Sequence, residues 1–112
     1  MHIIIHIIIL TKSWLYDIFN MDTHIGSFVW NIGKELENIY KHGVDFKTAT
    51  AVFKDPNRKF YTDAKHSEGE ERYFCIGKVE GRVLTVRFTY CNGEIRIIGA
   101  GYWRKGVRYY ER

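Results

Sequence analysis

The stretch YFCIGKVEGRVLTVRFTYCNGEIRIIGA, residues 73–100, decides the fold. Its alternating apolar residues are interrupted at Glu80-Gly81 and again at Asn92-Gly93. A two-residue loop between alternating strands needs a positive φ at its central positions, which asparagine and glycine accept most easily. The stretch therefore predicts antiparallel strands over residues 73–79, 82–90 and 94–100, joined by two tight turns.

The two turns also determine which residues face one another. Counting from the first turn places Arg72 opposite Thr89, and counting from the second places Thr89 opposite Arg96. Side chains alternate between the two faces of a sheet, so these residues share one face with Arg87. We call it the arginine face, after Arg72, Arg87 and Arg96. The other face is expected to form the core, and it carries Tyr73, Cys75, Val79, Leu84, Val86, Phe88, Ile95 and Ile97.

Composition predicts one small domain in a reducing compartment. A chain of 112 residues can bury a single core. Its 17 Lys and Arg against 13 Asp and Glu give a net charge of +4, which permits an anionic partner without requiring one. The isoleucine-rich residues 3–9 are too few to cross a membrane, which takes about 20 residues. Two cysteines are too few for a disulfide framework. We expect a cytoplasmic protein without membrane association.

The residues before the hairpins predict helices. Residues 28–30 are a short apolar stretch typical of an edge strand, and residues 33–42 have helical spacing that ends at Gly43. Asp45 is placed to cap a second helix over residues 46–53. A strand over residues 58–62 and a polar loop over residues 63–70 follow, and residues 103–110 have the spacing of a short terminal helix.

These elements indicate an α+β domain. Two N-terminal helices would pack on an antiparallel sheet of about four strands, and a short C-terminal helix would complete the fold.

Six blocks of the sequence carry a family pattern: Phe28-Val29-Trp30, residues 41–46, Ala51-Val52-Phe53, residues 66–73, Ile76-Gly77 and residues 95–98. Together these blocks resemble BrnT-type toxins over residues 28–112. The resemblance implies a RelE-like fold, an endoribonuclease that arrests translation, RNA on or near the ribosome as substrate, and a DNA-binding antitoxin as partner. The preceding residues 1–27 have no counterpart in this pattern, and Met21 is an alternative start of the chain.

One position departs from the family pattern. After Arg-Ile-Ile the family usually continues with Ser-Ala-Arg, which would put a basic residue at position 101. This chain has Gly101 there, followed by Tyr102-Trp103. Arg104 or Lys105 could supply the missing positive charge.

The arginine face suits the chemistry of RNA cleavage without a metal. That reaction needs a base for the 2′-OH, cations for the developing phosphate charge and an acid for the leaving 5′-oxygen. Arg72 and Arg96 could converge on one phosphate, since an arginine fork meets two phosphate oxygens. His66, in the loop before Arg72, is the candidate acid or base. The candidate RNA-binding residues are Arg87, Thr89, Arg104 and Lys105.

Other interpretations of the same residues remain open. The arginines could form salt bridges with nearby glutamates, and the face would then belong to a non-catalytic module that binds nucleic acid or an antitoxin. Alternatively, Glu68, Glu70 and Glu71 could hold Mg²⁺ for a metal-dependent phosphodiesterase. We expect the metal-independent reaction, with no metal and no cofactor.

The domain boundary predicts that residues 1–20 contribute little to stability. A chain that starts at Met21 should keep the thermal midpoint of the full chain, because the recognisable domain begins after that residue. Thermal unfolding of both chains, followed by circular dichroism, measures the difference. A collapse of the midpoint would mean that the isoleucine-rich segment belongs to the core.

Overall fold

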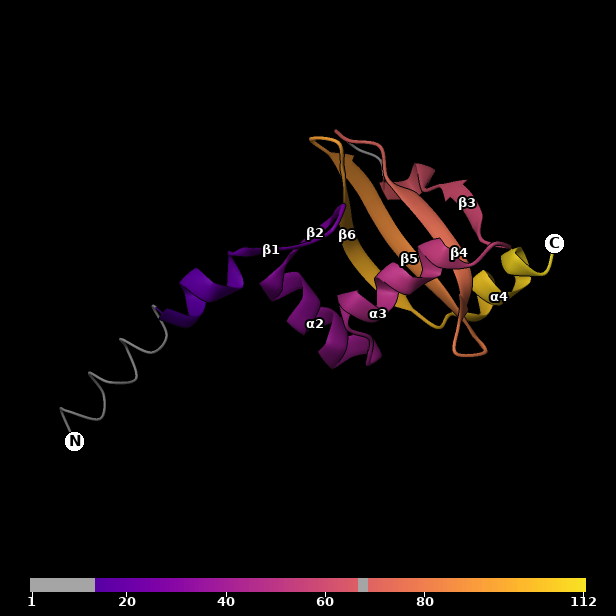
Figure 1. Ribbon diagram of the computed structural model, residues 1–112, viewed down its shortest axis with the longest axis horizontal. Coiled ribbons are helices and arrows are strands. Elements are labelled where there is room, and N and C mark those ends of the chain that lie inside the picture. The colour runs from indigo at the N-terminus through magenta and orange to yellow at the C-terminus, as the bar shows by residue number, and fades with distance from the viewer. Residues whose placement is uncertain (1–13, 67–68) are drawn as a thin grey trace.

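The computed structural model describes residues 14–66 and 69–112 and has an α+β architecture (Figure 1). Residues 14–19 are helical, and the isoleucine-rich segment and Glu68 lie outside the described residues. The elements that follow, in chain order, are β1 (Asp22–Ile25), β2 (Phe28–Asn31), α2 (Ile32–His42), α3 (Phe46–Thr50), the 3₁₀ turn η1 (Ala51–Lys54), β3 (Lys59–Thr62), the 3₁₀ turn η2 (Ala64–His66), β4 (Tyr73–Val79), β5 (Arg82–Cys91), β6 (Glu94–Gly101) and α4 (Arg104–Tyr110).

The sheet is larger than expected and is mixed. Its six strands lie in the order β1-β2-β6-β5-β4-β3, and β2 runs parallel to β6 while the other pairs are antiparallel. The prediction of about four antiparallel strands was therefore wrong in both number and direction. Residues 28–30 do form a strand, but β1 covers its outer edge. Pairing between β2 and β6 joins distant segments, which no local pattern in the sequence reveals.

The two tight turns are present as predicted. Glu80 and Gly81 have φ values of 51° and 80°, and Asn92 and Gly93 have 53° and 79°. The register that they impose is confirmed near each turn, where Val79 pairs with Arg82 and Thr89 pairs with Arg96.

A bulge interrupts the β5–β6 ladder farther from its turn. Phe88 pairs with Ile97, but Arg87 pairs with Gly99, so β6 carries one extra residue at this point. Beyond the bulge, Ala100 lies opposite Val86. The simple count from the turn holds up to Ile97 and fails after it.

The local signals for the helices were correct. Asn31 caps α2 by accepting a hydrogen bond from the Lys34 amide at 2.9 Å, and Gly43 ends the helix at a φ of 70°. Asp45 caps α3 by accepting one from the Thr48 amide at 3.1 Å. The helix expected over residues 46–53 is divided, because the last part continues as the 3₁₀ turn η1.

Helices α2 and α3 cover the apolar face of the sheet (Figure 1). Asn38 of α2 is buried there, and its amide donates to the Ala100 carbonyl at 3.0 Å and accepts from the Ala100 N–H at 3.1 Å. This pairing satisfies a buried side chain and ties α2 to β6 just past the bulge. The core cluster comprises Trp30, Val44, Phe46, Ala49, Val52, Cys75, Leu84, Val86, Phe88, Ile97 and Ala100.

Helix α4 packs on the opposite face of the sheet. Gly106 contacts Thr85 of β5, whose side chain points away from that of its buried neighbour Val86. At its far end, the Tyr110 hydroxyl donates to Asp55 at 2.6 Å, and this carboxylate also accepts from the Lys78 amide at 2.7 Å. Glycine has a low intrinsic helix propensity, but close packing against Thr85 requires it at position 106.

Replacing Gly106 with alanine tests this packing. A Cβ at this position would lie 1.9 Å from Thr85 Oγ1, so Gly106→Ala should destabilise the fold by about 1–3 kcal/mol, the usual range for overpacking. An exposed helix would instead gain about 1 kcal/mol from the same change. Urea unfolding measures the free energy.

Two further variants show whether the clash is the cause. Thr85→Ala in the Gly106→Ala background should recover much of the loss, because it removes the clashing hydroxyl. Gly99→Ala is the matched control, since its Cβ would meet nothing closer than 3.6 Å. A Gly106→Ala protein as stable as the wild type would contradict the close approach.

Candidate functional site

The predicted row of residues on the arginine face is confirmed for Thr89 and Arg96, and Arg72 comes directly before β4. Thr89 of β5 pairs directly with Arg96 of β6, and the Thr89 hydroxyl donates to the carbonyl of Glu71, next to Arg72, at 2.7 Å. Arg87 lies two residues from Thr89 on the same strand and pairs with Phe74. Only 3% of Thr89 is exposed, so its hydroxyl serves the backbone more than the surface.

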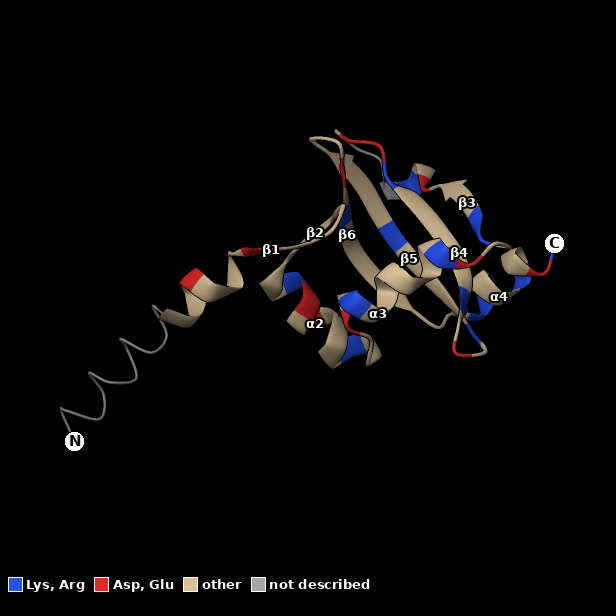
Figure 2. Ribbon diagram, viewed as in Figure 1, with Lys and Arg blue, Asp and Glu red and all other residues tan. Residues whose placement is uncertain are grey.

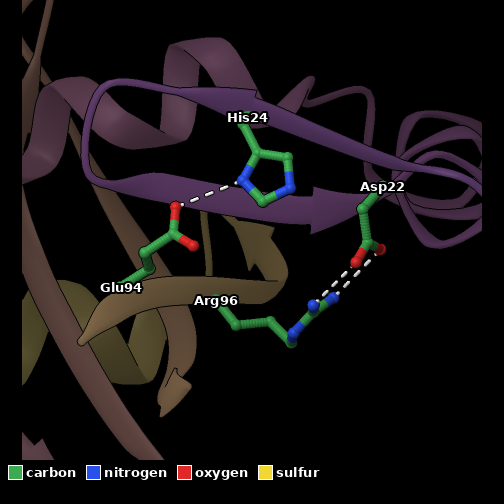
Figure 3. Close-up of polar contacts among 4 residues, drawn as sticks. All are labelled: Asp22, His24, Glu94 and Arg96. Carbon is green, nitrogen blue, oxygen red and sulfur yellow. Dashed lines mark hydrogen bonds and ion pairs between the residues drawn. The ribbon is translucent and has the colours of Figure 1, made fainter. Parts of the chain in front are cut away.

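Arg96 is held by a carboxylate from the N-terminal strand β1 (Figure 3). Its Nη2 and Nη1 donate to the two oxygens of Asp22 at 2.8 Å and 3.2 Å. Hydrogen bonding to Arg96 holds the pKa of Asp22 below its ordinary value, and the same bond raises the pKa of Arg96. The two charged groups therefore form a bidentate pair that remains partly exposed.

Arg87 has a different partner. Its Nε lies 3.2 Å from Oδ2 of Asp63, whose side chain is 4% exposed, whereas the Arg87 side chain is 30% exposed. This Nε is buried and makes no hydrogen bond, so the contact with Asp63 is an ion pair without directional hydrogen-bond geometry. The guanidinium also lies over the ring of Phe74, 5.6 Å from its centroid.

Arg72 is paired as well, with its Nε 3.5 Å from Glu70 Oε1. Each arginine of the arginine face thus has an acidic neighbour. Basic residues also occur on the helices, so the distribution of charge in Figure 2 does not by itself select one face. The salt bridge considered as an alternative for Arg72 is present, with Glu70, whereas the acidic partner of Arg96 is Asp22 of β1.

A groove of about 600 Å³ opens on the arginine face between α4 and the chain around η2. We call it the α4 groove. Its size lies within the ordinary range for small-molecule sites, about 300–1,000 Å³. Cationic and aromatic side chains line it together, from β3, η2, β5 and α4. The cations are Lys65, Arg87 and Lys105, and the aromatic residues are Tyr61, Phe74 of β4, Trp103 just before α4, and Tyr109.

The remaining candidate residues lie at different distances from the α4 groove. Lys105 lines it, whereas Arg104 is exposed and is not part of its lining. The backbone of His66 ends η2, directly after two residues that line the groove. Arg72 and Arg96 lie outside the lining.

Position 101 has a structural explanation. A Cβ on Gly101 would lie 2.6 Å from the indole of Trp103, so this ring occupies the space that a side chain at position 101 would need. The edge of the same ring meets His42 at the end of α2, with centroids 5.1 Å apart. Of the two residues considered as replacements for the missing charge, Lys105 is the one at the groove.

Sequence reasoning missed several members of this face. Asp22 reaches Arg96 across 74 positions of the chain, and no spacing rule links such residues. Asp63 appeared to belong to a polar loop, although it is buried beside Arg87. Along β3, Tyr61 lies between two exposed residues. The alternation of a predicted strand could have indicated that Tyr61 faces the side of the sheet opposite to those two neighbours.

Glu70 and Glu71, which were considered as metal ligands, have other partners in the structure. Glu71 accepts a hydrogen bond from the Tyr73 hydroxyl at 2.6 Å, and Glu70 pairs with Arg72. Across residues 14–66 and 69–112, no group of three or more His, Cys, Asp or Glu residues is arranged to hold a metal ion.

None of the helices described is long and apolar enough to cross a membrane.

The fold and the arginine face define a small α+β domain in which cations and aromatic rings gather on one side of a sheet. A family model described as "Ribonuclease toxin, BrnT, of type II toxin-antitoxin system" matches residues 30–106. The match spans more than half of the 112 residues, and the chain belongs to the BrnT family. The sequence-based assignment is confirmed. No curated protein matches the chain significantly.

The family description implies an RNA substrate and an antitoxin partner. The matched region contains Arg72, Arg87 and Arg96, together with most of the α4 groove. It begins after β1, so Asp22 lies outside it.

Removing the Arg96 guanidinium should raise the pKa of Asp22. Hydrogen bonding to Arg96 is the largest cause that lowers this pKa from 3.8, while burial acts in the opposite direction and would remain in Arg96→Ala. The carboxyl carbon of Asp22, followed by NMR, should therefore titrate at higher pH in the variant.

The lowered pKa of Asp22 determines how the stability of the fold changes with pH. The pair stabilises the fold above the ordinary pKa of Asp22, and this contribution is lost as the pH falls through the folded-state value. Stability should fall less on acidification in Arg96→Ala than in the wild type. An unchanged Asp22 titration would contradict the bidentate pair.

Proposed function

We propose that this protein is a RelE-like endoribonuclease toxin that cleaves cytoplasmic RNA without a metal and so inhibits translation, on or near the ribosome. One observation carries the proposal beyond the family match. Lysine, arginine and aromatic side chains line a single groove on the arginine face. Single-stranded RNA is bound by this combination, because cations hold its phosphates and rings stack on its bases. A DNA-binding antitoxin is the proposed protein partner.

The chemistry assigns a role to each group. Arg72 and Arg96 would stabilise the phosphate as its charge increases in the transition state, and His66 would donate or accept a proton. Thr89 pairs with Arg96, and its hydroxyl donates to the carbonyl of the residue before Arg72, so the heads of the two arginines could reach the same phosphate. The 2′-OH of the RNA would attack that phosphate and expel the 5′-oxygen, which leaves a 2′,3′-cyclic phosphate.

The α4 groove would hold the RNA next to the reacting phosphate. Arg87, Lys65 and Lys105 supply positive charge from three different elements, and Trp103 offers a partly exposed indole. Arg104 would bind phosphates farther along the strand. The Arg87 side chain is partly exposed at the groove, so its guanidinium could meet a phosphate there.

The first prediction concerns cleavage itself. Purified protein should cut RNA in the presence of EDTA, and substitution of the 2′-OH by hydrogen should abolish the cut. His66→Ala should slow cleavage by about 10²–10⁴-fold, the usual contribution of acid–base catalysis. Arg96→Ala should lose about 10²–10³-fold, as removal of a preorganised charge does elsewhere.

The alternative functions give different outcomes in the same assay. Loss of cleavage on addition of EDTA would favour a metal-dependent phosphodiesterase. Binding of RNA without any cleavage would favour the non-catalytic module, an alternative supported by the acidic partners of all three arginines. Full activity of His66→Ala would remove this residue from the mechanism.

The second prediction concerns the α4 groove. Arg87→Ala and Lys105→Ala should each weaken RNA binding and reduce the log–log salt dependence by about 0.7 per lost phosphate contact. Arg58→Ala is the matched control, because it also removes an exposed positive charge but lies outside the groove lining. Fluorescence anisotropy with a labelled, uncleavable 2′-deoxy strand measures both quantities. Equal effects of all three substitutions would mean that only net charge matters.

A further inference from the structure

Strand β1 brings two side chains to β6 across the intervening strand β2. On β1, Asp22 and His24 are two residues apart and so share a face of the strand. Asp22 reaches Arg96, and the His24 ring nitrogen Nδ1 lies 3.2 Å from Glu94 Oε2. Figure 3 shows both contacts side by side, and they form two rungs of a side-chain ladder between the same two strands.

The register explains how the ladder reaches across. Val29 of β2 pairs with His24 on one side and with Arg96 on the other. Val29 itself is only 2% exposed. β1 is itself held by antiparallel pairing along its whole length, from Asp22 opposite Asn31 to Ile25 opposite Phe28. The Asp22 carboxylate therefore stays next to the guanidinium at a high effective concentration.

A carboxylate bound in this way uses the same donors that a phosphate would use. Arginine presents a planar fork that meets either group through two parallel N–H bonds. In Arg96 these donors are Nη1 and Nη2, and both are directed at Asp22. A phosphate could not occupy the same fork while Asp22 remains in place.

We propose that β1 is a built-in competitor of RNA, in which the Asp22 carboxylate takes the place of a substrate phosphate on Arg96. This inference rests on the proposed function, in which Arg96 binds RNA phosphate. The side chains of both partners are about one-third exposed, so the pair is exchangeable. RNA binding must displace Asp22, and the strand lowers the affinity of the site without closing it.

Asp22→Asn tests the competition, since it removes the charge and nearly keeps the shape. Partly exposed ion pairs correspond to a change of up to about fivefold in an equilibrium, so affinity for an uncleavable 2′-deoxy strand should rise by up to this factor. The log–log salt dependence should increase by about 0.7, because one more phosphate contact forms. In the Arg96→Ala background, Asp22→Asn should have no effect on affinity.

Two controls separate competition from simpler causes. Asp17→Asn changes the net charge equally from the exposed N-terminal helix, and it should leave affinity almost unchanged. Glu94→Gln breaks the other rung while Asp22 stays on Arg96, and it should produce no gain in affinity.

A chain that starts at Met21 still contains Asp22 and should bind RNA like the full chain. Asp22→Ser is a second variant with the same expected gain, in case the asparagine disturbs folding.

The outcomes distinguish the two proposals. Unchanged affinity in Asp22→Asn, an equal gain in Asp17→Asn or Glu94→Gln, or a gain that survives Arg96→Ala would each overturn the competition. Absence of RNA cleavage by the wild type would instead overturn the proposed function. A gain in affinity that depends on Arg96 would then still support Asp22 as a competitor for an anion site.

Discussion

The pairing of β5 with β6, including its bulge, is the constraint on which the rest of the molecule depends. Because β6 carries one extra residue, Ala100 enters the core opposite Val86, and Gly101 lies beside Thr85 on the arginine face. An uninterrupted ladder would have placed Ala100 beside Thr85 instead. The indole of Trp103 could not then lie against a bare backbone, as it does at Gly101, and the α4 groove would lose one of its walls.

Helix α4 depends on this same face for its position. Gly106 meets the Thr85 hydroxyl so closely that no larger residue fits, and Tyr110 is hydrogen-bonded to Asp55 at the C-terminal end of the helix. A seven-residue helix gains little stability from its own backbone, so tertiary contacts must hold it. The groove is consequently bounded by packed elements, and Lys105 and Tyr109 are presented from a fixed surface.

Acidic partners make the arginine face stable without substrate. Arg72, Arg87 and Arg96 receive their carboxylates from three separate elements: the loop before β4, the residue after β3, and β1. The pairs of Arg72 and Arg96 are partly exposed, and ion pairs of this kind contribute at most about 1 kcal/mol each, whereas the Asp63 carboxylate beside Arg87 is buried. In the proposed function, the phosphates of an RNA replace the two exposed pairs. A toxin of the BrnT family would thus keep its cations paired until RNA or an antitoxin arrives.

The sequence by itself determined the features that local chemistry specifies. Positive φ values were required at Asn92-Gly93, and the capping role of Asp45 and the end of α2 at Gly43 followed from neighbouring residues. The resulting alternation was enough to place Arg72, Thr89 and Arg96 in one row.

Only the tertiary structure decided which other groups surround that row. The parallel pairing of β2 with β6 brings β1 close enough for Asp22 to reach Arg96, and the residues involved are 74 positions apart. The bulge in β6 and the burial of Asp63 beside Arg87 depend in the same way on which segments pack together. Such contacts arise from chain topology, and periodicity within one segment carries no information about them.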